Sequence, residues 1–251
     1  MLSFAAYSDP GSMNVLAFET STEACSVALH AGGRTLERFE VAPRRHAELA
    51  LPWAEQLLAE AGLARAQLDA IAVGRGPGAF TGVRLGIGLA QGIALALDLP
   101  LLPVSTLQVL ALRAPADAPR VLATIDARMG EVYAAAYERR DGVLVAASDE
   151  VVRAPEAVTL PGADDGWHAV GTGLAAANGV LAERLAARLA GVDAWALPHA
   201  ADLLALALPA FARGETVAPE SIEPAYLRDN VALTLEQQRK SRDSGSGLRN
   251  S

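Results

Sequence analysis

The sequence of 251 residues has little cysteine and an excess of acidic over basic residues. Because Cys25 is the only cysteine, an intrachain disulfide is excluded and nothing indicates export. Cys25 lies in an apolar strand pattern, so we interpret it as a buried structural thiol. Lysine and arginine number 21 against 29 acidic residues, giving a net charge of −8. This balance argues against tight, unaided binding to a nucleic-acid backbone, although a basic partner could still bring RNA close.

A long uninterrupted apolar run is also missing. Residues 85–102 are apolar but contain Gln91 and Asp98, so they do not predict a membrane span. Residues 1–12 lack the charged region and apolar run of a signal peptide. We expect these residues and the polar, serine- and glycine-rich residues 236–251 to be disordered extensions. The sequence therefore predicts a soluble protein of the cytoplasm that has no contact with a membrane.

Residues that would carry catalysis or bind a metal are scarce. The four histidines, His30, His46, His168 and His199, are isolated in the sequence, so their spacing does not suit paired imidazole ligands. No serine–histidine–aspartate or cysteine–histidine arrangement is evident. We therefore predict no catalytic residue, no metal site and no cofactor.

Hydrophobic residues make up 51% of the chain, enough for a substantial core, and their periodicity predicts an α/β organisation. In the first half, the predicted strands are 14–19, 24–31, 34–42, 68–74 and 100–105, and the predicted helices are 44–61, 81–98 and 105–114. In the second half, the predicted strands begin at 121, 131, 143 and 167, and the predicted helices are 174–190 and 199–213. We predict Ser105 as the N-cap of the helix that it precedes.

The two halves repeat one pattern. Residues 15–17 lead to the acid Glu19 and a polar turn, and residues 121–123 lead to Asp126 and a similar turn. Each half then continues as a β-β-β-α-β-α unit, which indicates an internal duplication. Duplicated units with an acid at the first hairpin resemble the actin, sugar-kinase and heat-shock ATPase superfamily, a ribonuclease H-like fold of two subdomains. We expect subdomains at 13–113 and 114–235. The last helices of the second subdomain are candidates to pack back on the first subdomain.

The stretch GRGPGAFTG at residues 74–82 is the sharpest local feature. Alternating glycines allow positive φ and a close approach of the backbone, and a helix N-terminus attracts anions. Gly76, Gly78 and Thr81 are therefore candidates for a phosphate-binding turn. However, the turn has no lysine, and Ala79 stands where G-x-G-x-x-G requires its third glycine. A structural turn from strand to helix is the favoured interpretation.

Glycines also occur inside the helix predicted at 81–98. Gly82 and Gly86 are spaced i, i+4, as are Gly88 and Gly92, although each helical glycine costs about 0.8–1 kcal/mol relative to alanine. Small residues at this spacing allow another backbone to come close. That backbone could belong to the protein's own sheet or to a partner, and both interpretations can hold on opposite faces of one helix.

These motifs resemble those of the TsaB (YeaZ) family. The similarity includes VLAFETSTEACSVAL from Val15, the glycine stretch from Gly76 to Leu107, the pattern DAR…VY from Asp126, and EPAYLRD from Glu223. It spans roughly residues 13–229. The family resemblance implies a non-catalytic relative of TsaD that, with TsaD and TsaE, supports transfer of a threonylcarbamoyl group to the adenosine beside the tRNA anticodon.

The resemblance also implies which partners and surfaces matter. TsaD would bind directly through a bundle of helices, TsaE through the TsaB–TsaD complex, and tRNA only indirectly, whereas the chain alone would form a homodimer. The predicted interface lies on the helices 44–61 and 81–98. It consists of Leu49, Trp53, Leu57, Gly82, Leu85, Gly86, Gly88, Leu89, Gly92 and Ile93.

Two alternatives stay open. The first is an independent small-molecule kinase or ATPase of the same fold. Against it, residues 105–110 lack the H-x-x-x-H pair of the catalytic paralogue, and the turn after Glu19 lacks the glycine that sugar kinases use for phosphate. The second is a homodimeric interaction protein with another client. ATP turnover by the purified chain would favour the first alternative over a TsaB-like role. A pull-down that fails to capture TsaD would favour the second.

Overall fold

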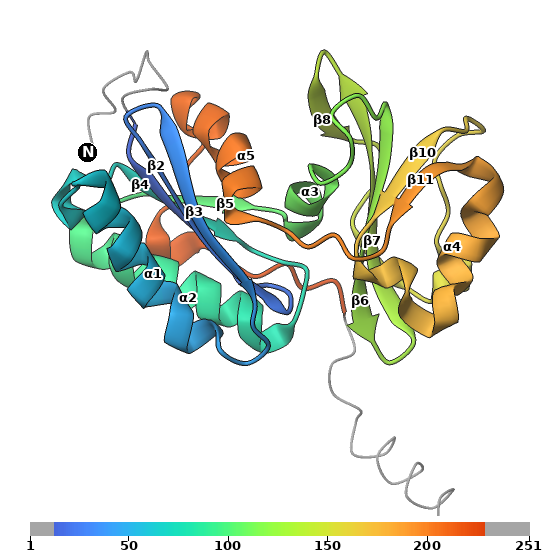
Figure 1. The fold of residues 1–251 in the computed structure, drawn as a ribbon, viewed down its shortest axis with the longest axis horizontal. Helices are drawn as coiled ribbons and strands as arrows, with labels where there is room; N and C mark the ends of the chain where they lie inside the picture. The colour runs from blue at the N-terminus through green and yellow to red at the C-terminus, as the bar shows by residue number, and fades with distance from the viewer. Residues whose placement is uncertain (1–12, 229–251) are drawn as a thin grey trace, which may run out of the picture.

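The computed structural model describes residues 13–228 and builds them around two mixed β-sheets (Figure 1). The expected extensions at 1–12 and 236–251 lie outside the described residues. The first sheet has the order β3-β2-β1-β4-β5, with β1, β2 and β3 antiparallel and β1, β4 and β5 parallel. Its strands are β1 (Val15–Glu19), β2 (Ala24–Ala31), β3 (Arg34–Val41), β4 (Ala70–Gly74) and β5 (Leu101–Val104).

The second sheet repeats this topology. Its order is β11-β10-β6-β7-β8, and its pairings follow the same sequence of antiparallel and parallel contacts. The predicted duplication and the actin-like, ribonuclease H-like fold are thereby confirmed. Its strands are β6 (Arg120–Arg128), β7 (Glu131–Arg140), β8 (Val143–Ala146), β10 (Trp167–Val170) and β11 (Leu189–Asp193). The short β9 (Val151–Arg153) also pairs with β7.

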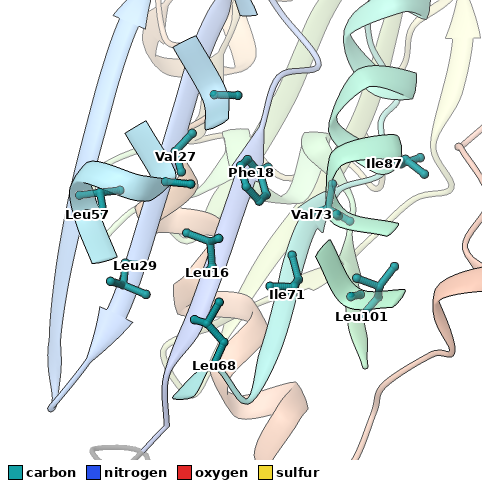
Figure 2. Packing of buried hydrophobic residues seen from close by; sticks show 14 of the residues in the cluster. Leu16, Phe18, Val27, Leu29, Leu57, Leu68, Ile71, Val73, Ile87 and Leu101 are labelled. Carbon is teal, nitrogen blue, oxygen red and sulfur yellow. The ribbon is translucent and has the colours of Figure 1, made fainter. Parts of the chain in front are cut away.

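Helices α1 (His46–Ala61) and α2 (Phe80–Leu97) cover one face of the first sheet (Figure 1). Figure 2 shows Leu16 and Phe18 of β1 between Leu57 of α1 and Ile87 of α2, and all four belong to one buried cluster. The inward face of α2 also contains Val83, Ala90 and Ala94, all buried. By length and composition α2 could cross a membrane, but one third of it is buried, on the face that packs against the sheet.

The remaining helices cover the other sheet faces, and two of them pack on the opposite half. Helix α3 (Thr106–Ala111) follows the first sheet but packs on β6 and β7. Helix α5 (Ala200–Ala212) follows the second sheet but packs on β1, β2 and β5. Helix α4 (Val180–Leu185) covers the far face of the second sheet. The 3-10 turns are η2 (Arg65–Gln67), η3 (Pro155–Ala157), η4 (Thr172–Leu174), η5 (Ala176–Gly179), η6 (Ala186–Arg188) and η7 (Pro219–Ser221).

Two predicted elements of the second half are wrong. The helix expected at 174–190 is reduced to the six residues of α4, flanked by short 3-10 turns. Ala177, Asn178 and Gly179 all have positive φ, which a continuous right-handed helix does not allow. The residues from Leu189 then form β11, which completes the parallel edge of the sheet. The single strand predicted to begin at residue 143 is also divided, into β8 and β9.

A polar cluster fastens the start of α5 to the first sheet. The Glu37 carboxylate accepts hydrogen bonds from the Ser26 hydroxyl at 2.8 Å and from the Ala201 amide at 3.1 Å. It also lies 3.1 Å from the His199 ring, which stacks on Phe39. Burial raises the pKa of Glu37, but hydrogen bonds from His199, Ala201 and Ser26 outweigh it, so the net pKa is lowered.

This cluster predicts how stability depends on acid. Because the pKa of Glu37 is lower in the folded protein, its stabilisation is present above its ordinary value of 4.5 and is lost as pH falls through the folded value. Glu37→Gln should lower the free energy of unfolding by about 1–3 kcal/mol at pH 7 and by less near pH 3. Urea denaturation across this range measures the difference. Glu55→Gln, in an exposed ion pair with Arg65, is the control. A pH-independent loss in Glu37→Gln would contradict the prediction.

Candidate functional site

A cleft of about 840 Å³ lies between the two halves of the molecule. Its walls come from the turn after β1, the start of α2, the turn between β6 and β7, and residues 224–228. Figure 1 shows the C-terminal segment crossing from the first half to the end of β6 beside this turn. There Arg228 contacts the Ala127 carbonyl oxygen and the Glu131 carboxylate. The two hairpins with the duplicated acids therefore face one cleft.

The first hairpin is sealed by direct backbone contact with the glycine turn and α2. A methyl group at Gly82 would lie 2.1 Å from the Thr20 carbonyl oxygen, and one at Gly78 would lie 2.2 Å from the Ser21 carbonyl oxygen. Glycine at these positions lets the Ala79 amide donate to the Ser21 carbonyl at 2.7 Å. The Thr20 hydroxyl donates to the Gly82 carbonyl at 2.8 Å. The first pair of small residues thus serves contact within the chain.

Glu19 lies beneath this hairpin and is fully buried. Its carboxylate accepts from the Ser21 amide at 2.8 Å and from the Thr106 hydroxyl at 3.1 Å. Burial raises the pKa of Glu19, although these hydrogen bonds oppose the shift. Gly74 makes room for the acid, because a methyl group there would lie 2.0 Å from a carboxylate oxygen. The Ser21 amide, which a phosphate-binding hairpin would offer to a ligand, is thereby engaged inside the protein.

The second hairpin is open at its tip. Asp126 accepts from the Arg128 amide at 2.7 Å and from the Arg128 guanidinium at 2.8 Å. Arg128, Met129 and Gly130 have successive positive φ values, and the Met129 side chain is 87% exposed. This turn presents the charges of Asp126 and Arg128 to the cleft, whereas the first hairpin is closed by contacts within the chain.

Arg84 on α2 is held between two aromatic rings at the edge of the cleft. Its guanidinium carbon lies 3.3 Å from the centroid of the Phe80 ring and 5.0 Å from that of Tyr226. It also donates to the Tyr226 hydroxyl and to the Phe80 carbonyl. Phe80 and Tyr226 are 61% and 58% exposed. The sequence prediction missed this group, because Tyr226 lies 142 residues from Arg84 in the chain. Tyr226 in EPAYLRD is the one signal that could have indicated it.

The structure separates the predicted interface residues into two sets. Leu57, Gly82 and Gly86 lie in the interior, where Gly86 faces Thr20, so they drop out of the predicted surface. Gly88 and Gly92 face open space, with no atom within 4 Å of an added methyl group. The others are partly exposed and lie beside the two outward glycines or on the adjoining face of α1. They are Leu49, Trp53, Leu85, Leu89 and Ile93. Leu95, which the prediction omitted, is 64% exposed on α2.

The three candidates for a phosphate-binding turn also differ in position. Gly76 is buried with a φ of +91° and packs against Val83, whereas Gly78 and Thr81 line the cleft. Ser105 caps α3 by accepting from the Gln108 amide at 3.3 Å, which confirms the predicted N-cap. Within residues 13–228, no group of three histidine, cysteine, aspartate or glutamate side chains is placed to bind a metal.

Comparisons with known proteins give a consistent result. A family model described as "TsaD: tRNA N6-adenosine threonylcarbamoyltransferase" matches residues 39–235. The Escherichia coli K12 protein named "tRNA threonylcarbamoyladenosine biosynthesis protein TsaB" is 46% identical over 226 residues, covering 88% of this chain and 96% of that protein. Its Haemophilus influenzae namesake is 40% identical over 233 residues, covering 87% and 95%. The solved structure "YeaZ from Pseudomonas aeruginosa" is 49% identical with a TM-score of 0.77, covering 86% of this chain and 100% of that one.

The two kinds of helix glycine predict opposite effects of the same substitution. Gly82→Ala should lower the free energy of unfolding by about 1–3 kcal/mol, because the added methyl overlaps the Thr20 carbonyl. Gly88→Ala should raise it by about 0.5–1 kcal/mol, because the methyl meets nothing and glycine weakens a helix. Chemical denaturation of both variants measures the difference. Equal effects would show that α2 does not contact the hairpin through its glycines.

The buried acid predicts a dependence on pH opposite to that of Glu37. Because the pKa of Glu19 is raised in the folded protein, the carboxyl group favours folding below its ordinary value of 4.5 and loses that contribution as pH rises through the folded value. Glu19→Gln should therefore gain stability relative to the parent protein as pH rises from 4 to 8. Urea denaturation at several pH values tests this, and a difference that stays constant with pH would contradict it.

Proposed function

Because this chain belongs to the TsaB (YeaZ) family, we propose that it is the non-catalytic scaffold subunit that TsaD and TsaE require for threonylcarbamoyl transfer to tRNA. The family name gives the coarser statement, that the chain takes part in the biosynthesis of tRNA threonylcarbamoyladenosine. The scaffold role and the identity of the partners are the proposal.

The first hairpin, whose polar groups are hydrogen-bonded within the chain, supports the non-catalytic part of the proposal. In the superfamily that the fold resembles, amides of this turn hold phosphate. Here the Ser21 amide donates to buried Glu19, and the Ser21 carbonyl accepts from Ala79 in the glycine turn. Opening the turn to a ligand would break both bonds and leave buried polar groups unsatisfied. This arrangement supports a chain whose contribution is structural.

The outward face of α2 supports the scaffold part. Its centre is the pair Gly88 and Gly92, bordered by Leu85, Leu89 and exposed Leu95. Small residues flanked by leucines allow a partner helix to approach closely and to bury apolar area at about 25 cal/mol per Å². We propose that TsaD binds here through helix packing, and that the same face forms a homodimer when the chain is alone. TsaE would join through the TsaB–TsaD complex and tRNA only indirectly, all in the cytoplasm.

An independent kinase or ATPase is the second candidate, and the 840 Å³ cleft is the observation that favours it. Purified chain incubated with ATP separates the two. The scaffold role predicts no turnover above a blank, whereas turnover abolished by a substitution in the cleft would favour the enzyme.

The partner surface predicts a selective loss of binding. Gly88→Arg and Gly92→Arg should leave the chain folded, because both positions face open space, but should weaken co-purification with co-expressed TsaD by at least about tenfold, a loss of about 1.4 kcal/mol. Ala205→Arg is the matched control, since Ala205 is exposed on α5 and α5 covers the opposite face of the sheet. Thermal melts confirm folding. Full TsaD binding by both glycine variants would contradict the proposed interface.

A further inference from the structure

The second sheet has a small hollow at its edge, separate from the cleft between the two halves. Its volume is about 180 Å³. The floor is the sheet face that carries Ala134 and Ala136 of β7 and Leu122 of β6. Alanine side chains fill little of the space above a strand, so the floor leaves room for a ligand. The volume lies below the range of about 300–1,000 Å³ that is usual for drug-sized ligands, which indicates a smaller molecule.

The hollow lies where the edge of this sheet is interrupted. Strand β8 ends at Ala146 and β9 begins at Val151, and both strands pair with β7. Between them, the Ser148 hydroxyl accepts a hydrogen bond from the Ala136 amide at 2.9 Å, and the Ser148 amide donates to the Ala136 carbonyl at 3.3 Å. These bonds fix the wall that Ser148 and Asp149 form.

Val158 and Thr159 form another wall of the hollow, and this wall is held by helix α4. The Arg184 guanidinium on α4 donates to the carbonyl oxygens of Pro155 and Val158. The Val158 side chain is buried in the core cluster of this sheet face, whereas Thr159 is exposed. Contacts within the chain therefore set both walls. A ligand meets a preformed site, which lowers the entropic cost of binding.

Two side chains of opposite charge line the hollow without being paired. Arg153 lies opposite Val132 in the pairing of β7 with β9, so it projects from the same sheet face as Ala134. Asp149 lies in the loop just before β9. Both residues are exposed, and within residues 13–228 neither side chain forms a hydrogen bond or an ion pair. The guanidinium and the carboxylate therefore keep their charges and their hydrogen-bonding capacity for a ligand.

We propose that this hollow binds a small α-amino acid as its zwitterion. The Asp149 carboxylate accepts hydrogen bonds from the ammonium group, and the Arg153 guanidinium donates to the carboxylate. The amino-acid side chain lies on the alanine floor beside the Thr159 hydroxyl, a surface that suits alanine, serine or threonine. The inference goes beyond the scaffold role, because the hollow is on the second sheet and α2 is on the first.

Titration of the full chain with alanine, serine and threonine, followed by amide NMR shifts, tests the proposal without any partner protein. Failure of the scaffold role would therefore not affect the result. We expect saturable binding in the millimolar range, with the largest shifts at the amides of Ala134, Ala136 and Ser148. Alaninamide lacks the carboxylate and N-acetylalanine lacks the ammonium group. Each should bind at least about tenfold more weakly than alanine, because it loses one charge-assisted contact.

Two substitutions connect binding to the hollow. Arg153→Met keeps the length of the side chain without its charge, and Asp149→Asn removes the opposite charge with little change of shape. Each should weaken alanine binding by at least about fivefold. Arg140→Met and Asp141→Asn are the matched controls, because they remove the same charges at exposed positions at the far end of β7 and in the turn that follows it. Both controls should leave the affinity unchanged.

Three results would overturn the proposal. They are no saturable shift with any of the three amino acids at tens of millimolar, equal affinity for alanine and its two singly charged analogues, and binding that survives both Arg153→Met and Asp149→Asn. Thermal melts show whether each variant folds. If a variant fails to fold, the two analogues decide the question on the parent protein, since they remove the same contacts from the side of the ligand.

Discussion

The contact between the backbone of α2 and the turn after β1 fixes the arrangement of the first half. Gly82 and Gly78 bring the helix and its preceding turn against the carbonyls of Thr20 and Ser21 at distances that no Cβ atom would allow. The start of α2 is thereby fixed at the edge of the cleft, and Arg84 and Phe80 are fixed with it. The same helix orientation directs Gly88 and Gly92 away from the sheet. One contact thus determines both the closed hairpin and the outward face.

The duplicated hairpins have diverged in opposite directions. In the first hairpin, the Glu19 carboxylate is buried and accepts hydrogen bonds from the Ser21 amide and the Thr106 hydroxyl. The acid of the second, Asp126, stays at the cleft and orients Arg128. The duplicated fold therefore has an asymmetric cleft. The hairpin of the first half is closed by hydrogen bonds within the chain, and the hairpin of the second half is exposed at its tip.

Local periodicity predicted most of the fold but little of the cleft. The strands and helices of the first half lie within two residues of their predicted bounds, except that α3 ends at Ala111 and the prediction placed its end at 114. Each of these elements has one clear apolar face or is a fully apolar core strand. The alanine-rich stretch after Gly173 misled the prediction, since its composition favours a helix while three consecutive left-handed residues interrupt it. The glycine turn was found from its own residues. The stack of Arg84 on Tyr226 was not, because 142 residues separate the two and no local pattern links them.

The exchange of α3 and α5 between the halves has a consequence for synthesis on the ribosome. The first sheet is made early, but the apolar face formed by Val15, Ala17 and Ala28 is covered mainly by α5, near the end of the described chain. The bond from the Ala200 amide to the Ser26 hydroxyl closes a loop of 174 residues. Until that segment emerges, the nascent first half exposes an uncovered apolar sheet, which is the kind of surface that chaperones bind and that aggregates in their absence. The first sheet therefore cannot complete its packing before α5 has been translated.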